Sequence, residues 1–437
     1  MKKFSAIVVL LLVSFAGARA QFLGTVSLES GYSDNMFSSA LRTPAASTDA
    51  TLMLGVFPED ANWAVNYTGA LTSFAQYPDR LFSTHSLGGS FGLPYGEDGN
   101  NNLSLLVMGA LRTDKPEYAL YDYRQAMASL SAKHYFLDNL FGQASLQTRY
   151  RSYPNFGELG YLENVAAIGS MVFLESRTSI RIQAEAGFKN YQKSSASSQS
   201  TAQFTGSSAT TSLTKGVAGI EGGGPGNGGG GNGGGGNGGG GTGGGSGWGG
   251  GGSGGIGMGQ HGLNPEVSYL MYDEPSTSQV RLWVNIGQAL GEQTGLSLRF
   301  QQRINLTERG RAFVGGTVDL IGEEELFDDP YSYEGSEASL TLTQILPWSM
   351  QARSGGFYFS KQYAYAASLD ENGTAGPMRL DTRFGAWIEI SKEIGGDWLL
   401  FQGMKLSLQY TYLRNQSNST WYDYSGNNIG FGISTDF

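Results

Sequence analysis

Apolar and polar residues alternate one by one along most of this chain. In the segment 296–301, which reads LSLRFQ, Leu and Phe alternate with Ser, Arg and Gln. The same period of two runs through 178–189, 404–412 and 427–437. Because successive side chains of a β-strand point to opposite faces, this pattern predicts strands with one apolar and one polar face.

Sixteen segments are predicted to be strands, because they show this alternation or are bounded by turn residues. The predicted strands are 22–33, 48–57, 61–76, 82–93, 100–112, 121–136, 138–152, 161–174, 177–191, 277–290, 294–306, 333–346, 348–361, 378–391, 396–413 and 424–437. The segment 311–320 is a further candidate, but by itself it would make the number of strands odd. The expected range is therefore 14 to 18 strands, with 16 favoured.

The connections between these strands alternate in length. Tight turns are expected at 58–60, 137, 175–176 and 347. Long connections are expected at 34–47, 113–120, 153–160, 192–276, 307–332, 362–377 and 414–423. Short periplasmic turns and long extracellular loops are typical of outer-membrane barrels.

The length of the strands separates this fold from a soluble β-sandwich. The predicted strands have 10 to 18 residues, long enough to cross a tilted bilayer, whereas strands of soluble proteins usually have about five or six. In lipid every backbone polar group needs an internal partner, so a membrane-spanning sheet has to close on itself. We therefore predict an all-β protein, a closed antiparallel transmembrane β-barrel over residues 21–437.

The longest connection, 192–276, contains a low-complexity block at 222–259. Only ten of the 38 residues in this block are not glycine. Such a segment buries almost nothing and has a high backbone entropy, so it is predicted to be disordered within a surface loop. A surface tether, an adhesive segment, a flexible occluder of a pore and an insertion without function all remain open.

The first twenty residues have the pattern of a secretory signal peptide. Lys2 and Lys3 precede an apolar run, and Ala18-Arg19-Ala20 forms an A-x-A cleavage site before Gln21. The apolar run has about fifteen residues, fewer than the roughly twenty that a membrane-spanning helix needs. The protein is therefore expected to be exported, with residues 1–20 removed.

The amino-acid composition argues against several classes of function. The chain has no cysteine, which excludes disulfides, thiol catalysis and cysteine-based metal sites. Charged residues make up 15% of the 437 residues, against about 25% in soluble domains, and aromatic residues make up 12%. The net charge of −10, or −13 without the predicted signal peptide, argues against a nucleic-acid partner.

Many aromatic residues lie near the predicted strand ends, where the two membrane interfaces are expected. We predict that they form the aromatic girdles of a membrane barrel. The residues are Tyr32, Trp63, Tyr67, Phe74, Tyr77, Tyr121, Tyr123, Tyr150, Tyr153, Trp348, Trp387, Trp398, Tyr410, Tyr412, Trp421, Tyr422 and Tyr424.

Two short motifs resemble those of bacterial outer-membrane barrels. The last strand ends in Phe437, with Ile433 and Phe431 upstream, and resembles the closing strand that the barrel-assembly machinery reads as its signal, although Thr435 departs from the pattern. The segment 31–37 (GYSDNMF) resembles the opening of porin-like barrels found with exopolysaccharide and surface-assembly systems, with Ser33 in place of an acidic residue. The resemblance implies an outer-membrane barrel of a Gram-negative-type bacterium, in contact with lipid and lipopolysaccharide.

The polar faces of the predicted strands carry many cations and few acids. The candidate pore-lining residues are Arg149, Arg151, Arg181, Arg281, Arg299, Arg303, Arg383 and Lys405, with Lys189 and Arg353 on similar faces. The clearest acids on these faces are Glu185, Asp381 and Glu389. If the polar face lines the lumen, aligned cations would raise the local concentration of anions. The alternative is that these cations pair with carboxylates and only fill the barrel.

Other chemistry is weakly represented. Acidic residues gather at 323–325, 328–329 and 370–371, where a surface divalent-cation site is conceivable but a solvated run of charge is the simpler interpretation. The three histidines, His85, His134 and His261, are not expected to converge, and no serine motif surrounds them. We therefore expect no enzyme, no cofactor and no metal.

The sequence favours a passive outer-membrane channel for solutes or for an exported polysaccharide, including an anionic one. The alternative is a structural or adhesive surface protein whose barrel displays the glycine-rich loop. The solute and the oligomeric state are left open.

Overall fold

The structure is a computed structural model. It describes residues 20–36, 38, 40, 42–59, 61–96, 99–155, 157, 160–192, 200–203, 266–270, 276–307, 312–313, 329–370, 375–395 and 403–437. The predicted signal peptide and the glycine-rich block 222–259 lie outside these residues, apart from Ala20. No helix within the described ranges is long and apolar enough to cross a bilayer.

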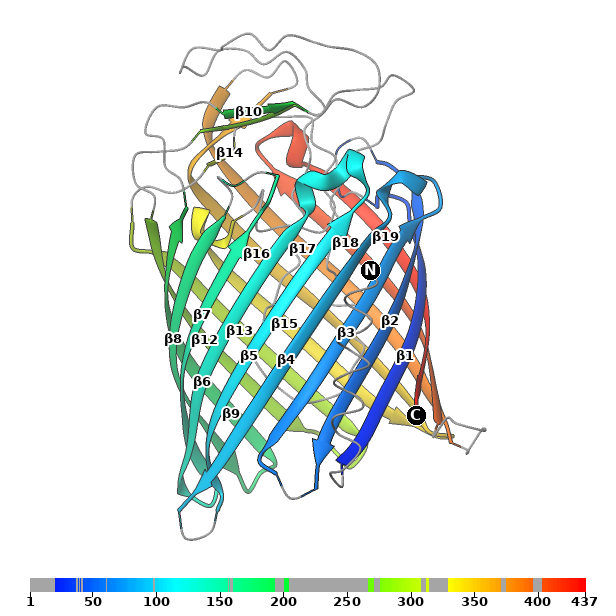
Figure 1. Cartoon of the computed structure of the whole chain (residues 1–437), viewed down its shortest axis with the longest axis vertical. Coiled ribbons are helices and arrows are strands. Elements are labelled where there is room, and N and C mark those ends of the chain that lie inside the picture. The colour runs from blue at the N-terminus through cyan, green and yellow to red at the C-terminus, as the bar shows by residue number, and fades with distance from the viewer. Residues whose placement is uncertain are drawn as a thin grey trace.

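Sixteen antiparallel strands form one closed barrel with strongly tilted strands (Figure 1). They are β1 (Ala20–Ser33), β2 (Ala45–Pro58), β3 (Trp63–Phe74), β4 (Phe82–Tyr95), β5 (Asn101–Asp114), β6 (Tyr123–Leu137), β7 (Leu140–Ser152), β8 (Tyr161–Leu174), β9 (Thr178–Tyr191), β12 (Ser276–Ala289), β13 (Thr294–Asn305), β15 (Tyr333–Leu346), β16 (Met350–Leu369), β17 (Ala375–Ile394), β18 (Gly403–Ser417) and β19 (Tyr424–Asp436). Each strand pairs with its neighbours in chain order, and β19 pairs with β1. The prediction of a sixteen-strand barrel is confirmed.

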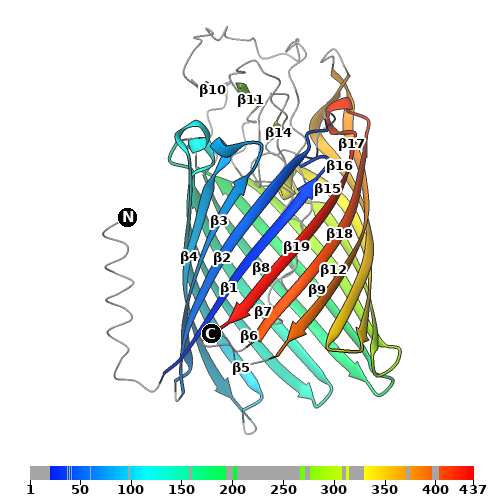
Figure 2. The ribbon, with the colours of Figure 1, turned by 90° about the vertical axis from the view of Figure 1, so that its right-hand side faces the viewer.

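The barrel closes between its first and last strands, which lie side by side in Figure 2. Leu28 pairs with Ile433, and Ser30 pairs with Phe431. The backbone N–H of Phe437 donates to the carbonyl of Gly24 at 2.8 Å, and the N–H of Gly24 donates back at 2.9 Å. The residues of the predicted assembly signal therefore lie on the strand that closes the sheet; their recognition by an assembly machinery stays a prediction.

The outer face of the barrel is apolar. Leu146 is 61% exposed and Ile168 is 68% exposed, and both alternate with less exposed side chains on their strands. Large exposed apolar side chains occur on every strand of the barrel. An apolar exterior on a closed antiparallel barrel is the design that lipid requires, so the chain is a transmembrane β-barrel of the outer-membrane type.

The strand boundaries agree with the predictions except at one hairpin. The predicted long connection 362–377 is wrong: β16 continues to Leu369 and β17 already begins at Ala375. The two strands stay paired through register shifts after Gln362 and after Ala367, and such bulges interrupt the alternation on which the prediction relied. The first part of the predicted strand 396–413 lies outside the described residues up to 402, and that strand extends to Ser417.

Short elements lie at the end of the barrel that carries the long connections. They are the 3-10 helices η1 (Pro78–Arg80), η2 (Pro116–Tyr121), η4 (Pro330–Ser332) and η5 (Thr420–Tyr422), and the strands β10 (Ser200–Gln203), β11 (Glu266–Leu270) and β14 (Ala312–Phe313). The last three form a separate sheet in the order β10-β11-β14 (Figure 1). The described part of the candidate segment 311–320 therefore belongs to this small sheet and not to the barrel.

The aromatic girdle prediction is wrong for several residues. Tyr32, Tyr150 and Tyr410 do face outward and are exposed. Phe74, Tyr121, Tyr153 and Tyr424, in contrast, are buried inside the barrel, and Trp387 occupies an inward position of β17. A position near a strand end does not decide between lipid and lumen, because the face depends on register.

Candidate functional site

All eight candidate pore-lining cations project to the inside of the barrel. On β7, β9, β12 and β13 the even-numbered side chains are the exposed apolar ones, so the odd-numbered arginines face inward. Arg149, Arg181, Arg281, Arg299 and Lys405 are half-buried. Arg151, Arg303 and Arg383 are buried, so they face the interior within packed side chains and not at an open surface. Their role in conduction stays a prediction.

Six of these residues share one side of the lumen, which we call the basic wall. The basic wall consists of Arg149, Arg151, Arg181, Arg281, Arg299 and Arg303. They come from β7, β9, β12 and β13, four of the five consecutive strands of this arc of the barrel. Arg281 pairs across strands with Glu185 on one side and with Arg303 on the other, so the cations form a ladder across the sheet. Arg383 and Lys405 lie on β17 and β18, away from this wall.

Part of the basic wall is neutralised by lumenal carboxylates. Arg149 forms an ion pair with Glu163 of β8, with 2.6 Å between Nη2 and Oε2. Arg281 forms an ion pair with Glu185. Glu163 was not among the predicted lumenal acids, although it follows the same alternation as Glu185.

Arg181 and Arg299 stand on the two sides of Trp283 in the middle of the wall. Their guanidinium carbons lie 4.7 Å and 5.4 Å from the centroid of the indole ring. Arg181 donates to the amide oxygens of Gln183 and Gln143 at 3.0 Å and 3.3 Å, and Arg299 donates to Gln301 at 3.1 Å. Within the described part of the chain neither arginine forms an ion pair with a carboxylate.

Trp283 was missed as a lumenal residue because tryptophans are usually assigned to the lipid interface. It is buried at 9% exposure, and its indole N–H donates to Glu185 at 3.3 Å. Its odd position on β12, between Arg281 and Asn285, was the signal that could have found it.

The side of the lumen opposite the basic wall has a different character. In the order of the barrel β1 is eight strands from β9, and β2 is eight strands from β12. Glu29 and Asp49 face inward from these two strands, and Asp49 accepts a hydrogen bond from Thr72. Acidic and hydroxyl side chains therefore face the arginines across the barrel.

A ring of buried tyrosines occupies the end of the lumen that carries the long connections. This tyrosine collar consists of Tyr121, Tyr153, Tyr161, Tyr191, Tyr333, Tyr363 and Tyr424. Cations stack on it: the ammonium of Lys189 lies 3.9 Å from the ring centroid of Tyr161, and the guanidinium of Arg379 lies 4.3 Å from that of Tyr363. Buried cation–π contacts are stronger than exposed ones because the charge is desolvated. The collar therefore fills and braces this end of the barrel wall.

Residues 329–332, which lead into β15, fold against the collar and form what we call the hook. Asp329 accepts from the ammonium of Lys189 at 2.8 Å and from the hydroxyl of Tyr191. The carbonyl of Pro330 accepts from Gln279 at 2.7 Å. Burial and the nearby carboxylate of Glu163 raise the pKa of Tyr331, so its hydroxyl stays protonated as a donor.

The other predicted chemistry does not converge in the described residues. Asp329 is the described residue of the acidic cluster 323–329, and its carboxylate binds Lys189. No group of three or more potential metal ligands occurs within the described ranges. His85, three residues from the start of β4, and His134, three residues from the end of β6, lie at opposite ends of their strands and face outward, while His261 lies outside the described residues.

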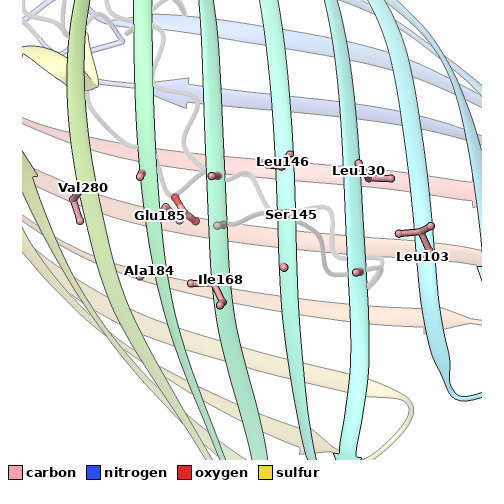
Figure 3. Close-up of a pocket in the computed structure, with 13 residues that line it drawn as sticks. Leu103, Leu130, Ser145, Leu146, Ile168, Ala184, Glu185 and Val280 are labelled. Carbon is pink, nitrogen blue, oxygen red and sulfur yellow. The ribbon is translucent and has the colours of Figure 1, made fainter. Parts of the chain in front are cut away.

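A groove crosses the outer face of β5 to β9 and β12, on the side of the sheet away from the lumen (Figure 3). It is lined mainly by small outward side chains, among them Ala132, Ala144 and Ala184, between larger ones such as Leu130 and Ile168. Because the surrounding face is apolar, the groove belongs to the lipid-facing surface of the barrel.

No protein-family model matches the sequence, and no curated protein matches it. Among solved structures, the chain is similar to Pseudomonas aeruginosa OprD, with 8% identity, a TM-score of 0.44 and 97% of each chain covered. It is similar to Acinetobacter baumannii OccAB1, with 10% identity, a TM-score of 0.44, and coverage of 95% of this chain and 96% of that one. It is also similar to a bacterial polysaccharide outer membrane secretin, with 9% identity, a TM-score of 0.43, and coverage of 95% of this chain and 97% of that one. With TM-scores below 0.5, the fold assignment rests on the strand pairing of the chain itself.

Proposed function

We propose that this barrel is a passive outer-membrane channel that favours anions, either small solutes or an exported anionic polysaccharide. The observation that carries this proposal is the pair Arg181 and Arg299, two lumenal cations without a carboxylate partner in the described part of the chain. The buried Nε of Arg299 makes no hydrogen bond there. A lumenal guanidinium that forms no ion pair with a carboxylate is suited to a passing carboxylate, sulfate or phosphate.

The size and shape of the barrel support conduction. Barrels of 16 to 18 strands are wide enough to leave an aqueous channel, whereas eight-stranded barrels are filled by their own side chains. The half-buried state of Arg181, Arg281 and Arg299 is consistent with water along the basic wall. Fixed positive charge along such a path raises the local concentration of anions and lowers that of cations.

The first prediction concerns ion selectivity. The double variant Arg181→Gln and Arg299→Gln removes two charges but keeps the amide-like hydrogen bonding of the wall. Each unit charge about 7 Å from the ion path is worth ~0.6 kcal/mol in water, so the loss of two charges is expected to lower the ratio of anion to cation permeability at least about sevenfold. The measurement is the reversal potential of single barrels in planar bilayers under a salt gradient.

The matched control removes two charges outside the lumen. Arg124 and Lys392 are exposed on the outward faces of β6 and β17. The variant Arg124→Gln with Lys392→Gln should leave the reversal potential unchanged. An unchanged reversal potential in the lumenal variant would contradict the anion preference, and the absence of conductance steps in the folded wild type would contradict the channel itself.

A display role is the second candidate, supported by the small sheet outside the barrel. Gln203 pairs with Glu266, so the segment 204–265, which contains the glycine-rich block, begins and ends at neighbouring positions of a β-ladder. A ladder at its base is suited to presenting a loop without disturbing the barrel. The second prediction is that deletion of 222–259 reduces attachment of cells to surfaces and leaves single-channel conductance unchanged. Wild-type attachment after the deletion would rule out the display role.

A further inference from the structure

Two aromatic side chains lie flat against the lumenal wall of β16 and β17, on a part of the barrel that the basic wall does not include. Phe357 and Trp387 both occupy inward positions and are half-buried. In the register of the sheet, Phe357 is opposite Gly385 and Trp387 is opposite Gly355. Each ring therefore covers the glycine of the other strand.

The glycines make this flat arrangement possible. A Cβ added at Gly355 would lie 2.8 Å from Cε2 of Trp387, and a Cβ added at Gly385 would lie 2.6 Å from Cε1 of Phe357. Because no side chain intervenes, each ring rests against the backbone of the neighbouring strand and stays half-buried on the lumenal side. The two rings form what we call the aromatic platform.

Covering a glycine is not by itself a binding function. Tyr67 covers Gly69 and Phe136 covers Gly142 on outward faces of the barrel, where the contact stabilises the sheet. The platform differs because its two rings occur together, face the lumen and are surrounded by polar side chains.

The polar surroundings of the platform consist of hydroxyl, amide and charged groups. Thr341 pairs with Gly355 on one side, and Thr411 pairs with Trp387 on the other. The guanidinium carbon of Arg353 lies 5.6 Å from the ring centroid of Trp387, and Arg353 forms a 3.8 Å ion pair with Glu389. Within the described residues the hydroxyls of Ser339 and Thr341 make no hydrogen bond, so they are available to a ligand.

Three large apolar side chains lie on the wall across the lumen. In the barrel order β5 is eight strands from β16, which places it on the opposite side. Leu106 and Met108 of β5 and Met127 of β6 face inward and are half-buried, on a wall where the other inward side chains are mostly small and polar. A ligand that touches both walls would therefore need apolar surface on two sides and polar groups at its edges.

We propose that the aromatic platform is a saccharide-binding subsite, which takes one pyranose ring of a glycan chain inside the lumen. A pyranose has C–H groups on its faces, which suit the negative faces of aromatic rings, and hydroxyls at its edges, which suit Ser339, Thr341, Thr411 and the Arg353–Glu389 pair. This inference rests on the proposed channel function and names a substrate class for it. The neutral Arg353–Glu389 pair means that the sugar need not be charged to bind here.

The test uses a neutral glucose hexasaccharide as the probe and the full-length folded protein. Two measurements are made: blockage of the single-channel current in planar bilayers and calorimetric titration of the detergent-solubilised barrel. For the wild type we expect blockage and binding. For Phe357→Leu with Trp387→Leu, which keeps apolar bulk but removes the flat faces, we expect at least tenfold weaker binding and a conductance within about a factor of two of the wild type.

Matched variants separate binding from folding. Trp387→Phe keeps a ring and is expected to retain most of the binding, and Phe136→Leu removes an outward ring over a glycine and is expected to bind like the wild type. If the double variant fails to show the heat-dependent gel mobility of a folded barrel, the single variants Phe357→Leu and Trp387→Leu replace it, each with at least threefold weaker binding expected.

The outcomes distinguish this inference from the channel proposal. A wild type that conducts but neither binds nor is blocked by the hexasaccharide overturns the saccharide subsite and leaves the channel standing. Leucine variants that bind like the wild type also overturn it. Calorimetric binding that the leucine variants lose, in a barrel without conductance, supports the subsite and overturns the channel.

Discussion

Glu185 illustrates how a single residue can set the charge of the lumen. Its carboxylate pairs with Arg281 and accepts from the indole of Trp283 and from the amide of Gln183 at 2.7 Å. It is therefore the acid that limits the positive charge in the middle of the basic wall. The residue is half-buried, and its removal leaves no packing void of importance if the replacement has the same shape.

The third prediction follows from this position. Glu185→Gln removes one negative charge, keeps the side-chain shape and leaves Arg281 without its ion-pair partner. The ratio of anion to cation permeability is expected to rise about two- to threefold, from the same ~0.6 kcal/mol per unit charge in water. The reversal potential measures the change, and a shift toward cations would show that Arg281 loses its lumenal position in the variant.

At the residue scale, alternation along a strand predicted the inward side of all eight candidate cations. It did not predict which of them are buried, because burial depends on partners from other strands. Arg303 donates to the hydroxyl of Tyr333 at 2.9 Å, and Arg383 donates to that of Tyr424 at 3.1 Å. Both tyrosines begin a strand, and the register of the sheet turns both inward, although Tyr424 was predicted to belong to the interface girdle.

At the scale of elements, the hook joins a loop to the barrel wall through buried charge. Lys189 is 1% exposed and Asp329 is 2% exposed, and each would be costly without the other. The sequence predicts that the acidic run containing Asp329 is exposed to solvent. Its partner Lys189 lies 140 positions away in the chain, so no local pattern could predict the ion pair.

The fourth prediction tests this pairing by a double-variant cycle. Lys189→Met leaves a buried carboxylate without its cation, and the free energy of unfolding is expected to fall by about 3–5 kcal/mol. Adding Asp329→Asn removes the orphaned charge and should recover at least half of that loss. Urea unfolding of the barrel in phospholipid vesicles measures both values, and equal losses in the single and double variants would contradict a buried ion pair.

The same elements explain where strand prediction worked and where it failed. β13 and β15 keep an uninterrupted register, and their predicted bounds differ from the observed ones by at most one residue. The β16–β17 hairpin extends beyond its prediction because paired backbone can continue through bulges after the alternation of side chains is lost. The aromatic platform could not be predicted from the sequence either, because each ring and the glycine that it covers lie on different strands.

At the scale of the whole molecule, the charge of the chain and the charge of its interior differ in sign. The chain carries a net charge of −10, yet the basic wall holds six arginines, of which two are paired with lumenal carboxylates in the described residues. Selectivity therefore follows from where the charges lie and not from their sum. The closure of the sheet could be predicted because lipid imposes it on any spanning sheet, and the number of strands could be predicted from the alternating segments along the chain.

The fifth prediction is a dependence of selectivity on ionic strength. The Debye length falls from about 10 Å at 0.1 M salt to about 3 Å at 1 M, so lumenal arginines act on the ion path over a shorter distance. The anion preference of the wild type should decline between these concentrations at a constant gradient ratio. The Arg181→Gln and Arg299→Gln variant should show a flatter dependence, and an equally steep one would place the selectivity elsewhere in the barrel.

The seam between β1 and β19 also has a consequence for the kinetics of folding. Thr25 donates to the carboxylate of Asp436 at 2.6 Å across a sequence separation of 411 residues, and the backbone of Gly24 is held by that of Phe437. Contacts between residues so far apart in the sequence form slowly. The chain loses the conformational entropy of closing a very long loop before the contact adds any stabilising free energy. The other strand pairs join barrel strands that follow one another along the chain, whereas this pair joins the first strand of the barrel to the last. A chain that lacked β19 would therefore leave β1 and β18 as two open edges of the sheet, and open edges are prone to aggregate.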